Sequence, residues 1–420
     1  MITFESDVHP KEPIPIGNAA NLHILRTNKF KSAVCCLLIR RPLSRDESTK
    51  NAVLSGILRQ GCIKYPSIPK INSLMEELFG SVFDCQIVKK GEEQIIQLYF
   101  EGIPDGGNIL KGIEFLLEVL LNPLTEGNGF KPETVFNAKN NVKNAVEGRI
   151  NNKAEYARNN CLATICEGEP FAVFADGSAE DLADLNADNL YQHYKEVLAT
   201  SPIELICAGN LDEAELTAAA SGLNIPNRTP ISIPFAKRGP ARTDVKIISE
   251  NLNSAQSKIC MGLRSDISPT SRQFYSLLMM NEILGGGPVS KLFTKIRERE
   301  SLCYYINSTL YRFKSIILIQ TGAAAGQFDH IVNLTGREIE EIRQGCVTRE
   351  EWDAARQSLN SKFRSGLDHF SSILDFYTVQ YLLNDKKSVM DILNEIDSVT
   401  LDETAEAAGY VKLDTAYELK

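Results

Sequence analysis

The chain repeats itself once, at an offset of about 220 residues, and this repeat restricts the possible folds more than any other feature of the sequence. In each copy a strand, a polar turn and a helix come first. A second helix, two strands and then two helices with acidic starts follow in the same order. The paired segments are residues 31–58 and 256–284, residues 71–102 and 291–322, and residues 110–139 and 331–356. A repeat this long predicts two duplicated domains, because solenoid units are much shorter.

The order of elements predicts an α+β fold. Strands that follow one another through short turns favour largely antiparallel sheets, and helical segments of period 3.6 favour covering layers. We therefore expect two homologous, pseudo-symmetric α/β sandwich halves that enclose a cleft. Residues 224–242 contain four prolines and little periodicity, as in an extended linker, so we place the domains at residues 1–235 and 236–420. The helical stretch 131–167 and the buried strand from Ile203 are assigned to the first domain.

Charge and cysteine usage exclude several classes of partner. The chain has 45 Lys and Arg against 54 Asp and Glu, a net charge of −9, so nucleic acid and membrane surfaces are not expected as general partners. Its ten cysteines lie mostly in apolar runs and include no Cys-x-x-Cys pair, which indicates reduced core thiols. The first residues lack a signal peptide pattern, and the longest apolar run, residues 33–39, is far below the roughly 20 residues of a membrane span. A cytoplasmic location is expected.

No metal site can be recognised from the residues alone. The five histidines include no pair within helix reach, and His193 is expected on a helix surface. The loop Gly285, Gly286 and Gly287 follows a helix, so it is interpreted as a helix cap and tight turn, or as a loop that also lines a cleft. Arg297 and Tyr304 are seven residues apart. They share one helix face if the helix continues, but a break at Ser301 would place Tyr304 on the following strand.

The stretch from Gly285 to Tyr304 resembles the pitrilysin/insulinase-type zinc metallopeptidases, whose signature is H-x-x-E-H. It contains a small-residue loop, Ser-x-Leu-Phe, Arg-Glu, and a Tyr seven residues after the Arg. The resemblance spans nearly the whole chain. It implies that Arg297 and Tyr304 help to hold the substrate and its oxyanion over a zinc ion.

The same resemblance implies that the first half has no zinc site. Ala52 and Gly56 fall at the two His positions of the signature, and Ser55 falls at the Glu position. Neither Ala nor Gly has a donor atom, and Ser cannot replace the carboxylate base. The downstream acidic ligand falls within residues 136–147, where Asn140, Asn141 and Asn144 predominate and Glu147 alone is no site. The chain is therefore not expected to be a peptidase by itself.

Bacterial members of this family often work in pairs, in which one subunit carries zinc and the other keeps the Arg and Tyr. The resemblance implies a non-catalytic subunit with no cofactor of its own, a zinc-bearing homologous partner, a peptide or protein substrate, and possible homodimers when the partner is absent. It is similar to the non-catalytic subunit associated with aminopentanol modification of elongation factor P, through residues 77–80, 153–157 and 168–177. One alternative is a non-enzymatic scaffold that captures an extended peptide by strand addition. Another is an enzyme that uses unrecognised residues.

Overall fold

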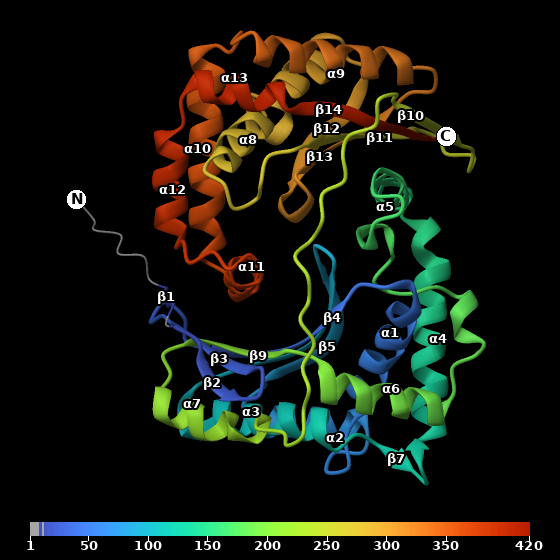
Figure 1. Cartoon of the computed structure of the whole chain (residues 1–420), viewed down its shortest axis with the longest axis vertical. Coiled ribbons are helices and arrows are strands. Elements are labelled where there is room, and N and C mark those ends of the chain that lie inside the picture. Colours follow the sequence, from blue (N-terminus) through green and yellow to red (C-terminus); the bar gives the residue numbers. More distant parts are fainter. Residues whose placement is uncertain (1–7, 11) are drawn as a thin grey trace. The chain divides into compact units, whose positions relative to one another are not determined.

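The computed structural model describes residues 8–10 and 12–420, which form two compact units (Figure 1). The first unit contains the described residues up to Glu147, residues 173–235 and residues 370–376. The second contains residues 148–172, 236–369 and 377–420. The chain passes between units at Phe235 and Ala236, within residues 224–245, which form neither helix nor strand. The division into peptidase-like domains at residues 1–235 and 236–420 remains a prediction.

The first unit is built on a mixed sheet with strand order β1-β3-β9-β4-β6-β5, and β2 pairs with β3. Only β3 and β9 pair in parallel; the other neighbours in this sheet are antiparallel. A separate hairpin joins β7 and β8. The elements are β1 (His9–Pro10), β2 (Ile14–Gly17), β3 (Ala20–Arg26), β4 (Ala33–Pro42), α1 (Arg45–Gln60), α2 (Ile68–Glu77), β5 (Val82–Lys90), β6 (Glu93–Gly102), α3 (Asn108–Leu121), β7 (Thr125–Glu126), β8 (Gly129–Phe130), α4 (Pro132–Gly148), α6 (Ala187–Thr200), β9 (Ile203–Gly209) and α7 (Glu213–Ala220).

The second unit has the strand order β10-β14-β11-β13-β12, which repeats the order β3-β9-β4-β6-β5 of the first. Its first pair, β10 and β14, is parallel and the other three pairs are antiparallel, as in the first unit. This match confirms the two-half fold predicted from the repeat. The elements are α5 (Lys153–Ile165), β10 (Lys246–Glu250), β11 (Ser257–Ser265), α8 (Gln273–Asn281), the π-helical turns η6 (Glu282–Gly286) and η7 (Phe293–Arg299), β12 (Cys303–Tyr311), β13 (Ile316–Ala323), α9 (Phe328–Arg343), α10 (Arg349–Gly366), α12 (Val389–Ser398), α13 (Leu401–Gly409) and β14 (Val411–Leu419). Helix α11 (Phe370–Leu382) is divided between the units, with residues 370–376 in the first and the remainder in the second.

Alternating side chains of the central strands build the core of the first unit. Cys35, Leu37 and Ile39 of β4 are fully buried and pack with the apolar faces of α1 and α3. Burial of each such side chain contributes roughly 1.5–3 kcal/mol, which fixes the register of the strand. Local signals mark the helix starts as well. Capping boxes pair Thr348 with Glu351 at α10 and Thr400 with Glu403 at α13.

Helix α5 packs on the sheet of the second unit, although residues 131–167 were expected to extend the first half. Cys161, Leu162 and Ile165 of α5 are buried against β11, β13 and β14. The approach is so close that a Cβ atom on Gly262 would lie 1.9 Å from Cδ1 of Ile165. The assignment of α5 to the first half was wrong because its apolar face fits a sheet formed about 100 residues later.

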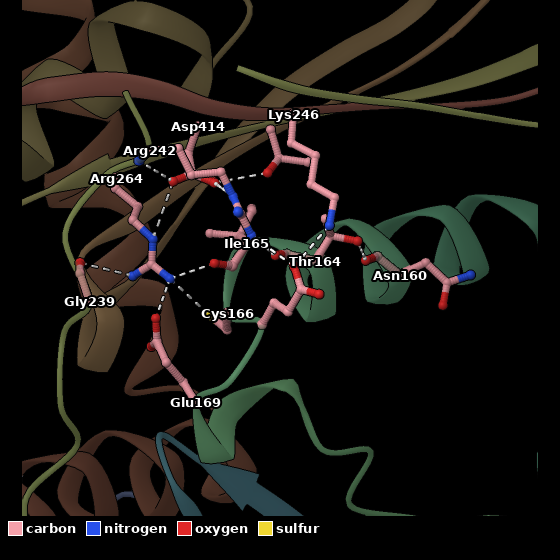
Figure 2. A network of polar contacts seen from close by, with 12 residues as sticks. Asn160, Thr164, Ile165, Cys166, Glu169, Gly239, Arg242, Lys246, Arg264 and Asp414 are labelled. Carbon is pink, nitrogen blue, oxygen red and sulfur yellow. Dashed lines mark hydrogen bonds and ion pairs between the residues drawn. The ribbon is translucent and has the colours of Figure 1, made fainter. Parts of the chain in front are cut away.

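A network of buried charges attaches α5 to that sheet (Figure 2). Arg264 of β11 donates hydrogen bonds to the carbonyls of Ile165 (2.6 Å) and Gly239 (3.2 Å). Its guanidinium also pairs with Glu169 and with the buried carboxylate of Asp414, 3.6 Å away. One side chain therefore connects α5, the linker and β14.

Candidate functional site

The three signature positions lie together on α1 and line a cavity of about 800 Å³ in the first unit. Ala52 and Ser55 are buried, and Gly56 faces Ala138 of α4 so closely that a Cβ atom at Gly56 would lie 3.1 Å from that of Ala138. The Ser55 hydroxyl donates a hydrogen bond to the carbonyl of Ala52 (2.9 Å), so it is bound to its own helix. These three positions therefore leave space in the cavity but supply no metal ligand.

Helix α4 supplies no replacement for a metal ligand. Asn141 lines the cavity, whereas Asn140, Asn144 and Glu147 are not among its lining residues. Glu147 lies 3.8 Å from Lys143 in an exposed pair. Within residues 8–10 and 12–420, no group of three or more His, Cys, Asp or Glu side chains could hold a metal ion. The residues present do not fit zinc, which needs nitrogen, sulfur or carboxylate donors.

A buried polar network holds α1 in place beside these positions. His193 of α6 contacts the Asn51 side-chain oxygen through Nε2 (2.8 Å), and the amide of Asn51 donates to Gln94 of β6 (2.8 Å). His193 is buried, so the expected surface position was wrong: its face of α6 is covered by α1. Burial lowers the pKa of His193 to about 4, although the nearby carboxylate of Glu47 opposes this shift. A neutral imidazole therefore orients Asn51.

Strand β5 borders the cavity and forms an edge of the sheet. The N–H group of Cys85 donates to the Asp84 carboxylate (2.9 Å), which shows that this N–H points away from β6. In an antiparallel strand the N–H and C=O groups of one residue point to the same side, and the next residue points to the opposite side. Phe83 and Ile87, two residues before and after Cys85, therefore also direct their backbone groups away from β6. This edge is not predictable from the sequence, because periodicity does not reveal the order of strands in a sheet.

Arg297 and Tyr304 lie in the second unit, on different elements. Helical structure stops before Ser301, whose φ is +53°, so Tyr304 belongs to β12 and not to a continued helix. The strand register shifts between Cys303 and Tyr305, which makes Tyr304 the extra residue of a β-bulge, and its side chain is 66% exposed. The Arg297 guanidinium stacks 4.4 Å from the Phe293 ring centroid. Burial raises the pKa of the Cys303 thiol, and the charge of Arg297 opposes the shift, so Arg297 lies near the start of β12.

The glycine loop is not a simple helix cap. Helix α8 continues through η6 as far as Gly286, and Gly285 has a φ of −155°, outside the left-handed region of a C-terminal cap. Glycine is needed for close packing instead. A Cβ atom at Gly285 would lie 2.8 Å from the Ser308 hydroxyl, and one at Gly286 would lie 2.2 Å from the Glu282 carboxylate. Gly287 lines a second cavity of about 320 Å³ with α10, while a role in a cleft between halves remains a prediction.

In the described part of the chain, no helix is long and apolar enough to cross a membrane. All ten cysteines lie in the described part of the chain, none of them forms a disulfide there, and nine of them are buried.

Comparison with known proteins links the chain to peptidase homologues. A family model described as the peptidase M16 inactive domain matches residues 184–359. The probable inactive metalloprotease YmfF of Bacillus subtilis is 25% identical over 405 residues, which cover 95% of each chain. The crystal structure of a conserved protein from Enterococcus faecalis superposes with a TM-score of 0.90 at 24% identity, over 99% of each chain. That of an inactive domain from Pseudomonas fluorescens has a TM-score of 0.78 at 16% identity, over 98% of each chain. The likeness to the group associated with elongation factor P remains a prediction.

Proposed function

Because the chain is an inactive homologue of the M16 peptidases, with Ala52, Ser55 and Gly56 at the metal-binding positions, we propose that it binds an extended peptide without cleaving it. The open edge of β5 beside the 800 Å³ cavity is the observation that supports this function best. Hydrolysis needs an activated water, which no ligand set in the cavity can supply. Peptide capture needs only a strand edge and space for side chains, and both are present.

The peptide adds to the sheet as a further strand next to β5. Phe83, Cys85 and Ile87 offer outward backbone groups, so the peptide pairs with every second residue of β5. Main-chain hydrogen bonds supply affinity in this mode, and side-chain pockets supply selectivity. The cavity lies along the same stretch of β5, because these three residues also line it.

A scan with N-methylated peptides tests strand addition without any change to the protein. The probe is an acetylated, fluorescently labelled heptapeptide of Ser and Thr with one central Phe, and its binding is followed by anisotropy. We expect methylation of alternate amides to weaken binding about fivefold each, since each removes a hydrogen bond of about 1 kcal/mol. Methylation of the intervening amides serves as the internal control and leaves the affinity unchanged. Sensitivity without this alternation contradicts strand addition.

A second candidate function adds a partner: a zinc-bearing homologous subunit to which this chain contributes Arg297 and Tyr304. The exposure of Tyr304 at a bulge of the edge strand β12 favours it, since bulges often direct a side chain towards a site. In this assembly the peptide is processed at the partner's zinc, and the isolated chain forms at most a weak homodimer. A reducing compartment, the cytoplasm, suits a protein whose ten cysteines form no disulfide within the described residues.

Co-expression with a homologue that carries H-x-x-E-H tests the assembly. We expect the two chains to co-purify as a heterodimer with one zinc ion per pair, measured by size-exclusion chromatography and elemental analysis. The same homologue mixed with an unrelated acidic protein provides the control. If the two chains stay separate at micromolar concentration and low salt, the peptide-binding function stands without the partner.

A further inference from the structure

The sheet of the second unit has an open edge at a place where the sheet of the first unit is covered. Strand β10 is the outermost strand of its sheet, and it has the place in the strand order that β3 has in the first unit. In the first unit, β1 and β2 pair with the outer side of β3. Within the described residues of the second unit, no strand pairs with the outer side of β10. An uncovered edge strand can pair with a strand of another molecule.

The backbone contacts of β10 show which of its groups point outwards. The carbonyl of Glu250 accepts a hydrogen bond from the N–H group of Lys420, directly after β14 (2.9 Å), so the backbone groups of Glu250 point towards β14. Because this direction alternates along a strand, Ile247 and Ser249 direct their backbone groups away from the sheet. The side chains of both residues are exposed, that of Ile247 by 65%. The edge therefore presents two outward pairs of N–H and C=O groups beside an apolar side chain.

The sequence of β10 is complementary to itself in the antiparallel direction. When two copies of β10 are paired about a two-fold axis at Ile248, Ile247 of each copy lies opposite Ser249 of the other. These outward residues form hydrogen-bonded pairs, each of which exchanges two main-chain bonds. In the same register, Lys246 of each copy lies opposite Glu250 of the other. Two opposite-charge pairs, which stabilise neighbouring strands, thus flank the centre.

The carboxylate of Glu250 has no cationic partner in the described part of the chain. It accepts hydrogen bonds from two tyrosine hydroxyls, one on α5 and one on β14, and forms no ion pair. Lys246 binds the carboxylate of Glu167 (2.8 Å), which also pairs with Arg242 (3.1 Å). Lys246 can therefore turn to Glu250 of a second copy without leaving Glu167 unpaired.

From these observations we infer that the chain forms a dimer with a second copy of itself, in which the two β10 strands pair in the antiparallel direction. The two five-stranded sheets then form one continuous sheet. The exposed Ile247 side chains of the two copies lie diagonally across the pair on the same face, which removes apolar surface from water. Such a short interface corresponds to weak association, with a dissociation constant of about 10–100 μM. The inference does not depend on peptide binding, because β5 belongs to the other unit.

Sedimentation velocity of the full chain at about 1–200 μM measures this association. Ser249→Pro removes an outward N–H group but no bond to β14, and proline is tolerated at such a position of an edge strand. Ser249→Ala keeps the N–H group and is the matched control. We expect wild type and Ser249→Ala to dimerise equally, and Ser249→Pro to dimerise about 25-fold more weakly, since the dimer loses two hydrogen bonds. The thermal midpoint of Ser249→Pro should stay close to that of wild type.

A mixing experiment tests the register of the two strands. Lys246→Glu alone places like charges opposite each other in a homodimer, and so does Glu250→Lys alone. Mixed in equal amounts, the two variants place opposite charges at both ends of the paired strands. We expect each variant alone to remain monomeric at concentrations at which wild type dimerises, and the mixture to form a heterodimer.

The remaining outcomes overturn the inference. Wild type that stays monomeric up to about 200 μM would leave the edge of β10 to a strand of a different protein. Equal dimerisation of wild type and Ser249→Pro would show that the dimer uses another surface. If Ser249→Pro has a lower thermal midpoint, the mixing experiment decides, because its variants keep every backbone N–H group. A heterodimer in the mixture then supports the pairing of β10, and a mixture that stays monomeric overturns it.

Discussion

At the scale of single residues, the environment of a side chain decides its role more than its type does. His193 was expected on a helix surface, yet it is buried and orients Asn51, which lies next in sequence to the signature position Ala52. Sequence could not show this, because one histidine on a helix looks the same whether or not another helix covers it. The losses at Ala52, Ser55 and Gly56 were visible in the sequence because donor atoms are a property of the residue itself.

The buried imidazole should make stability depend on pH. The pKa of His193 is about 4 in the folded chain, against 6.5 in the unfolded chain, so its contribution is complete above pH 6.5. As the pH falls from 6.5 to 4, the unfolded state binds a proton that the folded state does not. The free energy of unfolding therefore decreases over this range by up to about 3 kcal/mol. We expect His193→Gln to unfold in urea with a weaker pH dependence over this window. His330→Gln, on the exposed face of α9, is the control, and equal pH dependence in wild type and His193→Gln would contradict the assignment.

Tyr304 provides a test of the second candidate function in the assembled complex. A phenolic donor to a developing oxyanion is typically worth about 2.7–4 kcal/mol, so Tyr304→Phe should lower kcat roughly 100-fold or more without affecting assembly. Tyr305→Phe is the matched control. The Tyr305 ring is half-buried, and Lys258 Nζ lies 5.8 Å from its centroid. The Tyr305→Phe substitution should therefore leave turnover nearly unchanged. Normal turnover of Tyr304→Phe in an intact complex would exclude a catalytic role.

At the scale of elements, the sequence predicts helices and strands that depend on local patterns, but it does not predict packing between segments that are distant in the chain. The helix after residue 44, the hairpin of β5 and β6, and their counterparts in the second half follow from periodicity and turns. The place of α5 does not follow from local patterns. It depends on the close fit of Ile165 over Gly262 and on the Arg264 network, and both involve residues about 100 positions away in the sequence. The π-helical turn η6 was also missed, since the contact that requires Gly285 there is made with Ser308 of β12, more than 20 residues later.

The Arg264 network should therefore be essential for the second unit. Arg264→Met removes the buried cation that the carboxylates of Asp414 and Glu169 share, and removing one member of a buried pair costs about 3–5 kcal/mol. We expect a loss near the lower value, because Arg242 and Lys314 still face these carboxylates. Urea unfolding measures the change. Arg349→Met, which breaks an exposed pair with Asp353, should cost less than 1 kcal/mol, and equal losses in both variants would show that burial is unimportant here.

At the scale of the whole molecule, the two units share a strand order but differ in their sites. The repeat predicted the shared order, whereas the 800 Å³ cavity of the first unit could not be predicted, because it depends on how α1, α2, α4 and β5 meet. We expect the purified chain to contain no stoichiometric zinc and to hydrolyse no peptide by itself. Elemental analysis and a quenched-fluorescence peptide assay measure both properties. One zinc ion per chain, retained together with peptidase activity, would mean that the alignment of Ala52, Ser55 and Gly56 is wrong.

The position of the last strand in each sheet has a consequence during synthesis on the ribosome. Strand β9 is inserted between β3 and β4, which leave the ribosome more than 150 residues earlier, and β14 is inserted between β10 and β11 in the same way. Until each late strand emerges, the two strands that will flank it each keep an open edge towards it, with apolar side chains and unpaired backbone groups. Such long-range pairing folds slowly. A stalled chain that ends just before residue 203 or 411 should therefore be the form that aggregates or recruits chaperones.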